Sequence, residues 1–242
     1  FLHKIRNIFI NIFVHAIESE KSNFVNYLYF KSQEKTYEVL GERISKSLLF
    51  KDKYRFWDFL ILNTIKNINE NKSFKDNAIL EFGVGRGVSI KYFSERLKKN
   101  ELKIAGFDSF DGNPDVWPGT DNMIGASDQS GKIPKNLKSN VEIIKGLIEN
   151  TLEEFLIKKQ IKKIAFVHID VNIYSASSFI LKKLKPYFKK NTIILFDELV
   201  NYPFWWLNGE YKALKENFND DEYEFIAFDR TKRAAIKIIK LN

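Results

Sequence analysis

Short apolar runs that alternate with helical segments are the feature of this chain that most restricts its fold. Five runs, each of four or five residues and nearly continuous in hydrophobicity, occupy residues 78–82, 104–107, 141–144, 164–167 and 192–196. Such runs are typical of parallel strands buried on both faces. Helical patterns lie near 88–99, 151–160, 174–188 and 209–218. Strands that alternate with helices form parallel sheets through right-handed crossovers, so the pattern predicts a doubly wound α/β fold.

Two more apolar runs, at 225–228 and 234–239, close the chain and are separated only by residues 229–233. This gap is too short for a crossover and therefore predicts an antiparallel hairpin. We expect a mostly parallel sheet of seven strands. The turn-rich stretch 109–139 follows the second strand, so we expect a long binding loop or lid over the carboxyl edge of the sheet, where ligands of this architecture bind.

Residues 1–52 are predicted to form a helical N-terminal extension to a domain at 53–242. Apolar residues from Ile5 to Ile17 recur at helical spacing, and a further helix is predicted around 54–65. A basic amphipathic helix can lie on a membrane surface. We favour packing on the core or on a second subunit, which makes a homodimer through the N-terminal helices a hypothesis.

The composition excludes several classes of protein. There is no cysteine, which excludes disulfides, thiolate metal sites and thiol nucleophiles. No run approaches the 18 apolar residues of a membrane span. The net charge is +8, but only seven of the 39 basic residues are arginines, and phosphate recognition favours arginine. We therefore do not expect a nucleic-acid partner. No targeting signal is visible, so a cytoplasmic location is expected.

A glycine-rich turn follows the first strand, where Glu81 precedes Gly83, Gly85 and Gly87. Glycines let the backbone turn tightly and let a ligand approach a helix N-terminus, although a tight turn alone would also use them. The spacing differs from the G-x-G-x-x-G of dinucleotide sites. Asp108 ends the second strand, where it either accepts hydrogen bonds from a ribose or caps the loop. Together these features favour a nucleoside-type ligand.

Three carboxylates follow neighbouring strands of the predicted sheet: Asp170 after the fourth, and Asp197 and Glu198 after the fifth. Converging carboxylates repel each other unless a cation or a proton lies among them. Oxygen ligands suit Mg²⁺, Ca²⁺ or Mn²⁺, and such a cation would lower the pKa of a substrate hydroxyl. In the alternative, only one of the three faces the cleft. His168 is predicted to be a core histidine rather than a base.

Several motifs in this order carry a family resemblance: Glu81-Phe82-Gly83-Val84-Gly85-Arg86-Gly87, Gly106-Phe107-Asp108-Ser109-Phe110-Asp111-Gly112, His168-Ile169-Asp170-Val171-Asn172, Phe196-Asp197-Glu198 and Asn201-Tyr202-Pro203. The chain resembles the macrocin O-methyltransferase family over about residues 53–240. These class I enzymes methylate sugar hydroxyls with S-adenosylmethionine and a divalent cation such as Mg²⁺.

The resemblance implies roles for matching residues. Cofactor binding is expected from Glu81, Gly83, Gly85, Gly87, Ser89, Asp108 and Ser109. Metal binding is expected from Asp170, Asp197 and Glu198, with Asp170 also the candidate catalytic base. The chain departs from the family at Asn172, where a second Asp is usual, and at Phe204, where a small residue is usual. Ile173 occupies the position at which catechol-type methyltransferases carry a lysine, which favours a carboxylate base.

The sequence therefore predicts an S-adenosylmethionine-dependent O-methyltransferase, divalent-metal assisted, that acts on a sugar or glycosylated small molecule. A nucleic-acid methyltransferase on the same fold is an alternative, although residues 170–173 lack the N-P-P-[YF] motif of amino-group methylases. A nicotinamide oxidoreductase fits the glycine spacing poorly. A non-catalytic scaffold that binds S-adenosylmethionine also remains open. The aromatic run 204–206 either stacks on a sugar or packs in a core or subunit contact.

Overall fold

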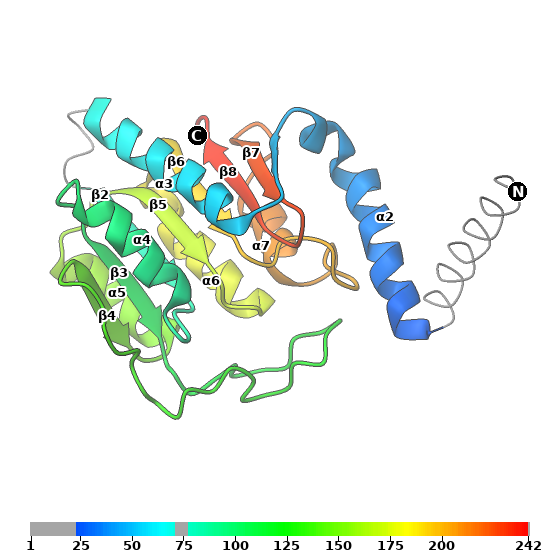
Figure 1. Cartoon of the computed structure of the whole chain (residues 1–242), viewed down its shortest axis with the longest axis horizontal. Coiled ribbons are helices and arrows are strands. Elements are labelled where there is room, and N and C mark those ends of the chain that lie inside the picture. Colours follow the sequence, from blue (N-terminus) through cyan, green and yellow to red (C-terminus); the bar gives the residue numbers. More distant parts are fainter. Residues whose placement is uncertain (1–22, 71–76, 242) are drawn as a thin grey trace, which may run out of the picture.

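The structure, a computed structural model, describes residues 23–70 and 77–241. An eight-stranded sheet forms its centre (Figure 1), in the order β1-β7-β8-β6-β5-β2-β3-β4. The strands are β1 (Leu48–Phe50), β2 (Asn77–Phe82), β3 (Ile104–Asp108), β4 (Val141–Lys145), β5 (Lys163–Ile169), β6 (Phe188–Phe196), β7 (Tyr223–Asp229) and β8 (Ala234–Ile238). Only β8 runs antiparallel to its neighbours, β6 and β7.

The doubly wound fold and the terminal hairpin are confirmed, but the sheet contains one strand more than the seven predicted. The additional strand is β1, which pairs in parallel with β7 at the edge of the sheet. It has only three residues, and Leu48 and Leu49 are exposed. A strand this short shows no periodicity in the sequence, so pattern analysis does not detect it.

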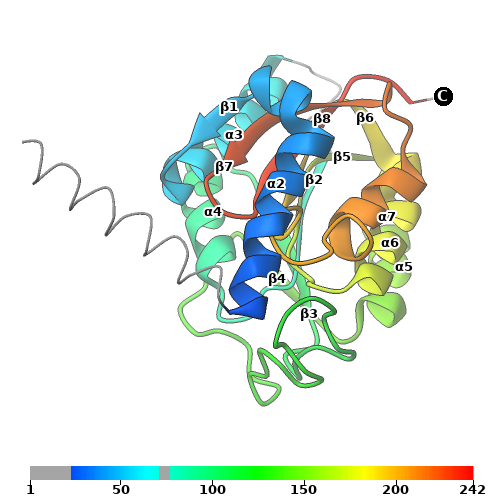
Figure 2. The ribbon, with the colours of Figure 1, turned by 90° about the vertical axis from the view of Figure 1, so that its right-hand side faces the viewer.

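Helices cover both faces of the sheet (Figures 1 and 2). Two lie on one face, α3 (Lys53–Glu70) and α4 (Val88–Lys98), and three on the other, α5 (Ile148–Lys158), α6 (Tyr174–Leu184) and α7 (Gly209–Asn217). The 3₁₀ turn η2 (Lys185–Tyr187) follows α6 because Pro186 cannot continue an α-helix. Strand side chains alternate between the two layers: Ile79 packs with α3 and α4, whereas Leu80 packs in the opposite layer.

Helix α2 (Phe24–Ser45) lies beside β7 and supplies Leu40 to the core layer of α6 and α7. Its carboxyl-terminal end is fastened by Arg43, which donates to the Tyr223 hydroxyl at 3.1 Å and pairs with Asp220 at 2.9 Å. A helical N-terminal segment is therefore present. The helix predicted around Ile5 to Ile17 lies outside the described residues, and the homodimer hypothesis that depends on it stays a prediction. No helix in the described ranges is long and apolar enough to cross a membrane.

The long loop between β3 and β4 contains turns but no helix or strand. It runs below the lower edge of the sheet in Figure 1. One end of this loop is anchored to the segment after β6: Trp117 is buried with its ring edge-on to Tyr202, at a centroid distance of 5.3 Å. Gly119, at φ +86°, lies so close to this segment that a Cβ would be 2.1 Å from the carbonyl oxygen of Pro203. The predicted long loop is therefore packed against the segment that follows β6.

Candidate active site

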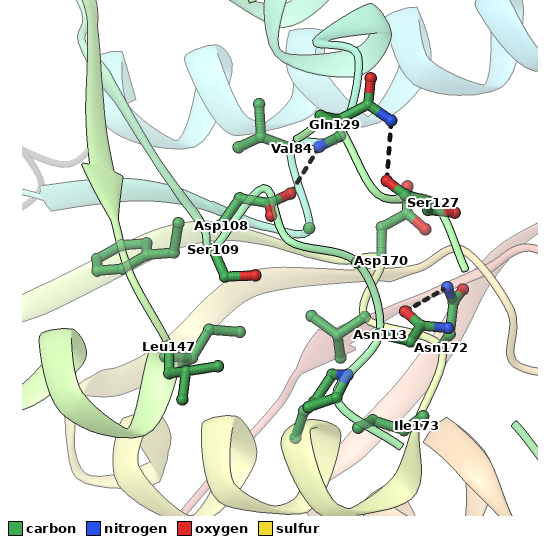
Figure 3. A pocket seen from close by; sticks show the side chains of 18 of the residues that line it. Val84, Asp108, Ser109, Asn113, Ser127, Gln129, Leu147, Asp170, Asn172 and Ile173 are labelled. Carbon is green, nitrogen blue, oxygen red and sulfur yellow. Dashed lines mark hydrogen bonds between the residues drawn. The ribbon is translucent and has the colours of Figure 1, made fainter. Parts of the chain in front are cut away.

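A cavity of about 360 Å³ opens at the carboxyl ends of β2, β3, β4 and β5 (Figure 3). The glycine-rich turn forms one wall, residues 107–109 and 146–149 form another, and residues 170–173 form the floor. Pro114, Ser127 and Gln129 from the long loop also line it. This volume is within the usual range for small-molecule sites, and the position matches the ligand crevice of open α/β sheets.

Asp108 joins the glycine-rich turn to the end of β3. Its Oδ2 accepts a hydrogen bond from the backbone N–H of Gly85 at 2.7 Å, and its Oδ1 accepts one from Phe110 N–H at 2.6 Å. Figure 3 shows this side chain at the wall of the cavity, beside Ser109. Asp108 therefore caps the loop and also faces the cavity. The sequence left open whether Asp108 binds a ribose or caps the loop, and its position is compatible with both.

The predicted cofactor-binding residues separate into two groups. Those that line the cavity are Gly83, Gly85, Ser89, Asp108 and Ser109. Glu81 and Gly87 lie behind it. Glu81 is fully buried, and its Oε1 accepts a hydrogen bond from the Ser89 hydroxyl at 2.9 Å. Gly87, at φ +75°, caps the N-terminus of α4 and faces Pro134. In this structure both residues support the turn from behind.

His168 is a buried core residue, as predicted, and it lies between two carboxylates. Its Nδ1 is 3.3 Å from Glu81 Oε2, and its Nε2 is 3.3 Å from Asp197 Oδ1. Burial lowers the pKa of this imidazole, but Asp197 and Glu81 outweigh that effect and raise the pKa to about 10. The imidazolium therefore links the strand ends of β2, β5 and β6 electrostatically.

The three predicted metal ligands are arranged unequally. Asp170 lines the cavity, whereas Asp197 and Glu198 lie beside it. His168, Asp170 and Asp197 each have one possible metal-ligand atom, and these three atoms lie within 4.8 Å of one another. Burial, together with the nearby Asp197 charge, raises the pKa of Asp170 well above its usual value. Within the described chain, the Asp170 carboxylate forms no hydrogen bond or ion pair.

Two cations that the sequence analysis missed contact the other two carboxylates. Arg233 Nε donates to Asp197 Oδ1 at 2.6 Å, and Arg233 Nη2 donates to Asp197 Oδ2 at 2.9 Å. Lys232 Nζ lies 3.0 Å from Glu198 Oε2. Burial raises the pKa of Asp197, but His168 and Arg233 outweigh it and lower the pKa to about 2. For Glu198 burial prevails over Lys232, and the pKa rises to about 6.

The pairing register of the sheet explains why these cations lie there. β6 and β8 are antiparallel with Phe196 opposite Ala234, so the next residues, Asp197 and Arg233, face each other. The signal in the sequence was the basic pair Lys232-Arg233 directly before the last strand. Glu210 was also missed: it is fully buried, and its Oε2 accepts the backbone N–H of Glu198 at 2.9 Å.

The expected divalent cation needs oxygen ligands that are free to coordinate it. Carboxylate oxygens are the right chemical kind for Mg²⁺. However, both oxygens of Asp197 are held by one guanidinium, Glu198 is paired with Lys232, and both nitrogens of His168 face carboxylates. Asp170 is the one member of the set that is not already paired among the described residues. In this arrangement the residues do not fit a divalent cation.

Comparisons with known proteins identify the class. Residues 80–199 match a family described as a methyltransferase domain. The fold is similar to that of CalS11, described as a calicheamicin methyltransferase, with a TM-score of 0.59, 20% identity and coverage of 91% of this chain and 92% of that one. An apo structure of CalS11, described as a TDP-rhamnose 3′-O-methyltransferase, has a TM-score of 0.55, 20% identity and coverage of 76% and 78%.

The O-methyltransferase NovP is also similar, with a TM-score of 0.52, 18% identity and coverage of 74% of this chain and 80% of that one. No curated protein sequence matches this chain. At such identities the structural likeness shows a shared fold. With that fold and its methyltransferase domain, the chain is a class I S-adenosylmethionine-dependent methyltransferase. This confirms the class that the resemblance implied.

Proposed function

We propose that the protein transfers a methyl group from S-adenosylmethionine to a hydroxyl of a sugar or glycosylated small molecule. The observation that carries this proposal is the position of Asp170, an unpaired carboxylate at the cavity surface whose pKa is raised by burial. A carboxylate with a raised pKa is a better proton acceptor near neutral pH. The site therefore offers a base for a hydroxyl acceptor beside a cavity suited to a nucleoside-type donor.

S-Adenosylmethionine supplies the methyl group as a positively charged sulfonium. The residues of this chain would hold and align it: Asp108 and Ser109 on the ribose side, and the turn around Gly83 and Gly85 on the methionine side. With the donor bound, the O–C bond to the acceptor would form as the C–S bond of the sulfonium breaks, which gives S-adenosylhomocysteine as the second product. Asp170 would take the proton of the acceptor hydroxyl. Catalysis is chiefly alignment and proton removal.

The acceptor class is argued from the aromatic run and from the similar folds. Trp205 is a core residue, fully buried, and it donates from Nε1 to the carbonyl oxygen of Ser32 at 3.2 Å. Phe204 is 40% exposed, and its ring lies 5.9 Å from that of Trp206. The exposed ring of Phe204 follows Pro203, which contacts Gly119 of the long loop, and such a ring suits stacking on a sugar. The description of CalS11 as a TDP-rhamnose 3′-O-methyltransferase agrees with this class.

The proposal is tested by methyl transfer from labelled S-adenosylmethionine to a panel of nucleotide sugars, glycans, glycosylated small molecules and RNA. We expect label in sugar-bearing acceptors. Asp170→Asn should reduce the rate by about 10²–10⁴-fold, the usual effect of removing a general base, while S-adenosylhomocysteine still binds. Asp115→Asn, on an exposed carboxylate of the long loop, is the matched control.

Two other outcomes would contradict the proposal and favour the remaining candidates. Label in RNA alone, with a steep dependence on salt, would indicate a nucleic-acid methyltransferase. Binding of S-adenosylhomocysteine without transfer to any acceptor class would favour a non-catalytic scaffold. Divalent-metal assistance, expected from the resemblance, is the alternative to a site in which Arg233 and Lys232 neutralise the carboxylates.

A further inference from the structure

The turn between β7 and β8 places two cations against the carboxylates at which a divalent cation was expected. Arg233 binds Asp197 through two parallel N–H···O hydrogen bonds of 2.6 and 2.9 Å. Lys232 pairs with Glu198 at 3.0 Å. A bidentate guanidinium satisfies a carboxylate in both geometry and charge. Asp197 therefore has no unpaired oxygen to offer a metal ion in this structure.

Arg233 is fixed in place by a second carboxylate behind it. Its Nη1 donates to Asp229 Oδ2 at 3.0 Å, and its backbone N–H donates to Asp229 Oδ1 at 3.2 Å. The side chains of Asp197 and Asp229 are only 7% and 3% exposed, and that of Arg233 is 20% exposed. Moving the guanidinium away would remove the arginine charge from two buried carboxylates, which is costly. The position of the Arg233 guanidinium is therefore fixed by its hydrogen bonds to both carboxylates.

Lys232 is held by aromatic rings and by its own backbone. Its ammonium lies 5.1 Å from the ring centre of Trp117 and 5.9 Å from that of Tyr202. Its carbonyl oxygen accepts the N–H groups of Leu199 and Val200 at 2.9 and 3.2 Å. These contacts fasten the turn to the segment that follows β6, so Lys232 keeps its place beside Glu198.

We propose that Arg233 and Lys232 take the place of a divalent cation at this carboxylate cluster, so that methyl transfer at the site needs no metal. The two side chains neutralise Asp197 and Glu198, which leaves Asp170 as the carboxylate that meets the acceptor hydroxyl. Arg233 and Lys232 are positioning residues in this account because they act through the carboxylates. The proposal rests on the proposed function in one respect: it assumes that the carboxylate cluster belongs to the methyltransferase site.

The test measures binding of Mn²⁺ alone, by electron paramagnetic resonance and calorimetry, to the full chain freed of metal by chelation and saturated with S-adenosylhomocysteine. We expect no Mn²⁺ site in the wild type that depends on Asp170. Arg233→Met frees Asp197 and should create such a site, with affinity at least about 10-fold higher than that of the wild type and a melting temperature raised by Mn²⁺. Arg230→Met, on an exposed arginine of the same turn, should leave Mn²⁺ binding unchanged.

A wild-type protein that binds one Mn²⁺ in the micromolar range, with binding abolished by Asp170→Asn, would overturn the proposal. A folded Arg233→Met variant that binds no more Mn²⁺ than the wild type would overturn the role given to Arg233. Should Arg233→Met fail to fold, the wild-type titration and Lys232→Ala, which frees Glu198, decide the question. No acceptor is needed, so failure here is distinct from failure of the proposed sugar specificity.

Discussion

The backbone of Gly83 lies directly against the backbone carbonyl of Asp170. A Cβ on Gly83 would be 1.8 Å from that oxygen, and the φ of Gly83 is +86°. The contact joins the glycine-rich turn after β2 to the start of the segment after β5, where the backbone N–H of Asp170 donates to Phe82 at 2.8 Å. The glycine-rich turn and the candidate base are therefore positioned by two adjacent backbone contacts.

Gly83→Ala should accordingly disrupt both parts of the site. The added methyl group must displace the backbone of Asp170, and the left-handed φ disfavours alanine, so we expect a loss of about 3 kcal/mol in the free energy of unfolding. Urea unfolding measures this loss. Gly125→Ala is the control, because Gly125 has φ +81° but open space around it and should lose only about 1 kcal/mol. Equal losses in the two variants would show that the contact with Asp170 is unimportant.

Trp117→Ala should detach the long loop from the segment after β6. The indole is buried against Tyr202 and beneath Lys232, and truncating a buried tryptophan costs about 3–5 kcal/mol when the site cannot collapse. We expect faster proteolysis within residues 109–139 and weaker binding of S-adenosylhomocysteine, because Ser127 and Gln129 line the cavity. Val116→Ala, on an exposed neighbour, should change neither rate nor affinity. Unchanged proteolysis in Trp117→Ala would contradict the anchoring role.

The attachment of α2 should weaken in acid through Asp220. Burial raises the pKa of Asp220, but Lys215 and Arg43 outweigh it and lower the pKa to about 2. A carboxyl group with a lowered pKa in the folded state contributes stability above its unfolded pKa of 3.8 and loses it as the pH falls toward 2. The Arg43–Asp220 ion pair is partly exposed to solvent, so we expect it to contribute about 1 kcal/mol or less to the free energy of unfolding.

Denaturant unfolding of the wild type and Asp220→Asn between pH 2 and pH 7 measures this contribution. The wild type should be the more stable of the two at pH 5–7, and the difference should shrink below pH 4. Asp221→Asn is the control: Asp221 pairs only with Lys240 near the C-terminus among the described residues and should show a smaller difference. A difference that is constant with pH would refute the assignment.

The core of the fold could be predicted from the sequence because each buried strand carries its own signal. Strands β2, β3 and β5 are almost continuously apolar, since helices cover both of their faces. The edge strand β1 carries no such signal, because Leu48 and Leu49 are exposed and its partner β7 lies far away in the sequence. Its pairing is decided by tertiary structure.

The site residues were likewise predictable only in part. Asp108 and Asp170 were identifiable because each lies at the carboxyl end of a recognisable strand. The contact of Arg233 with Asp197 depends on the register of β8 against β6, which the sequence pattern does not specify. Likewise, whether Glu81 faces the cavity or the core depends on its contacts with Ser89 and His168. Side chains next to a strand end can therefore be predicted, whereas their partners require the three-dimensional structure.

The central claim is that the glycine-rich turn and Asp108 bind the cofactor. It is tested most directly by calorimetric titration with S-adenosylhomocysteine, with and without Mg²⁺. We predict micromolar binding by the wild type that does not depend on Mg²⁺. Asp108→Ala should weaken this binding at least about 10-fold, because the carboxylate accepts hydrogen bonds from the backbone N–H groups of Gly85 and Phe110. Asp115→Ala should not weaken it. No binding by the wild type in either condition would contradict the account.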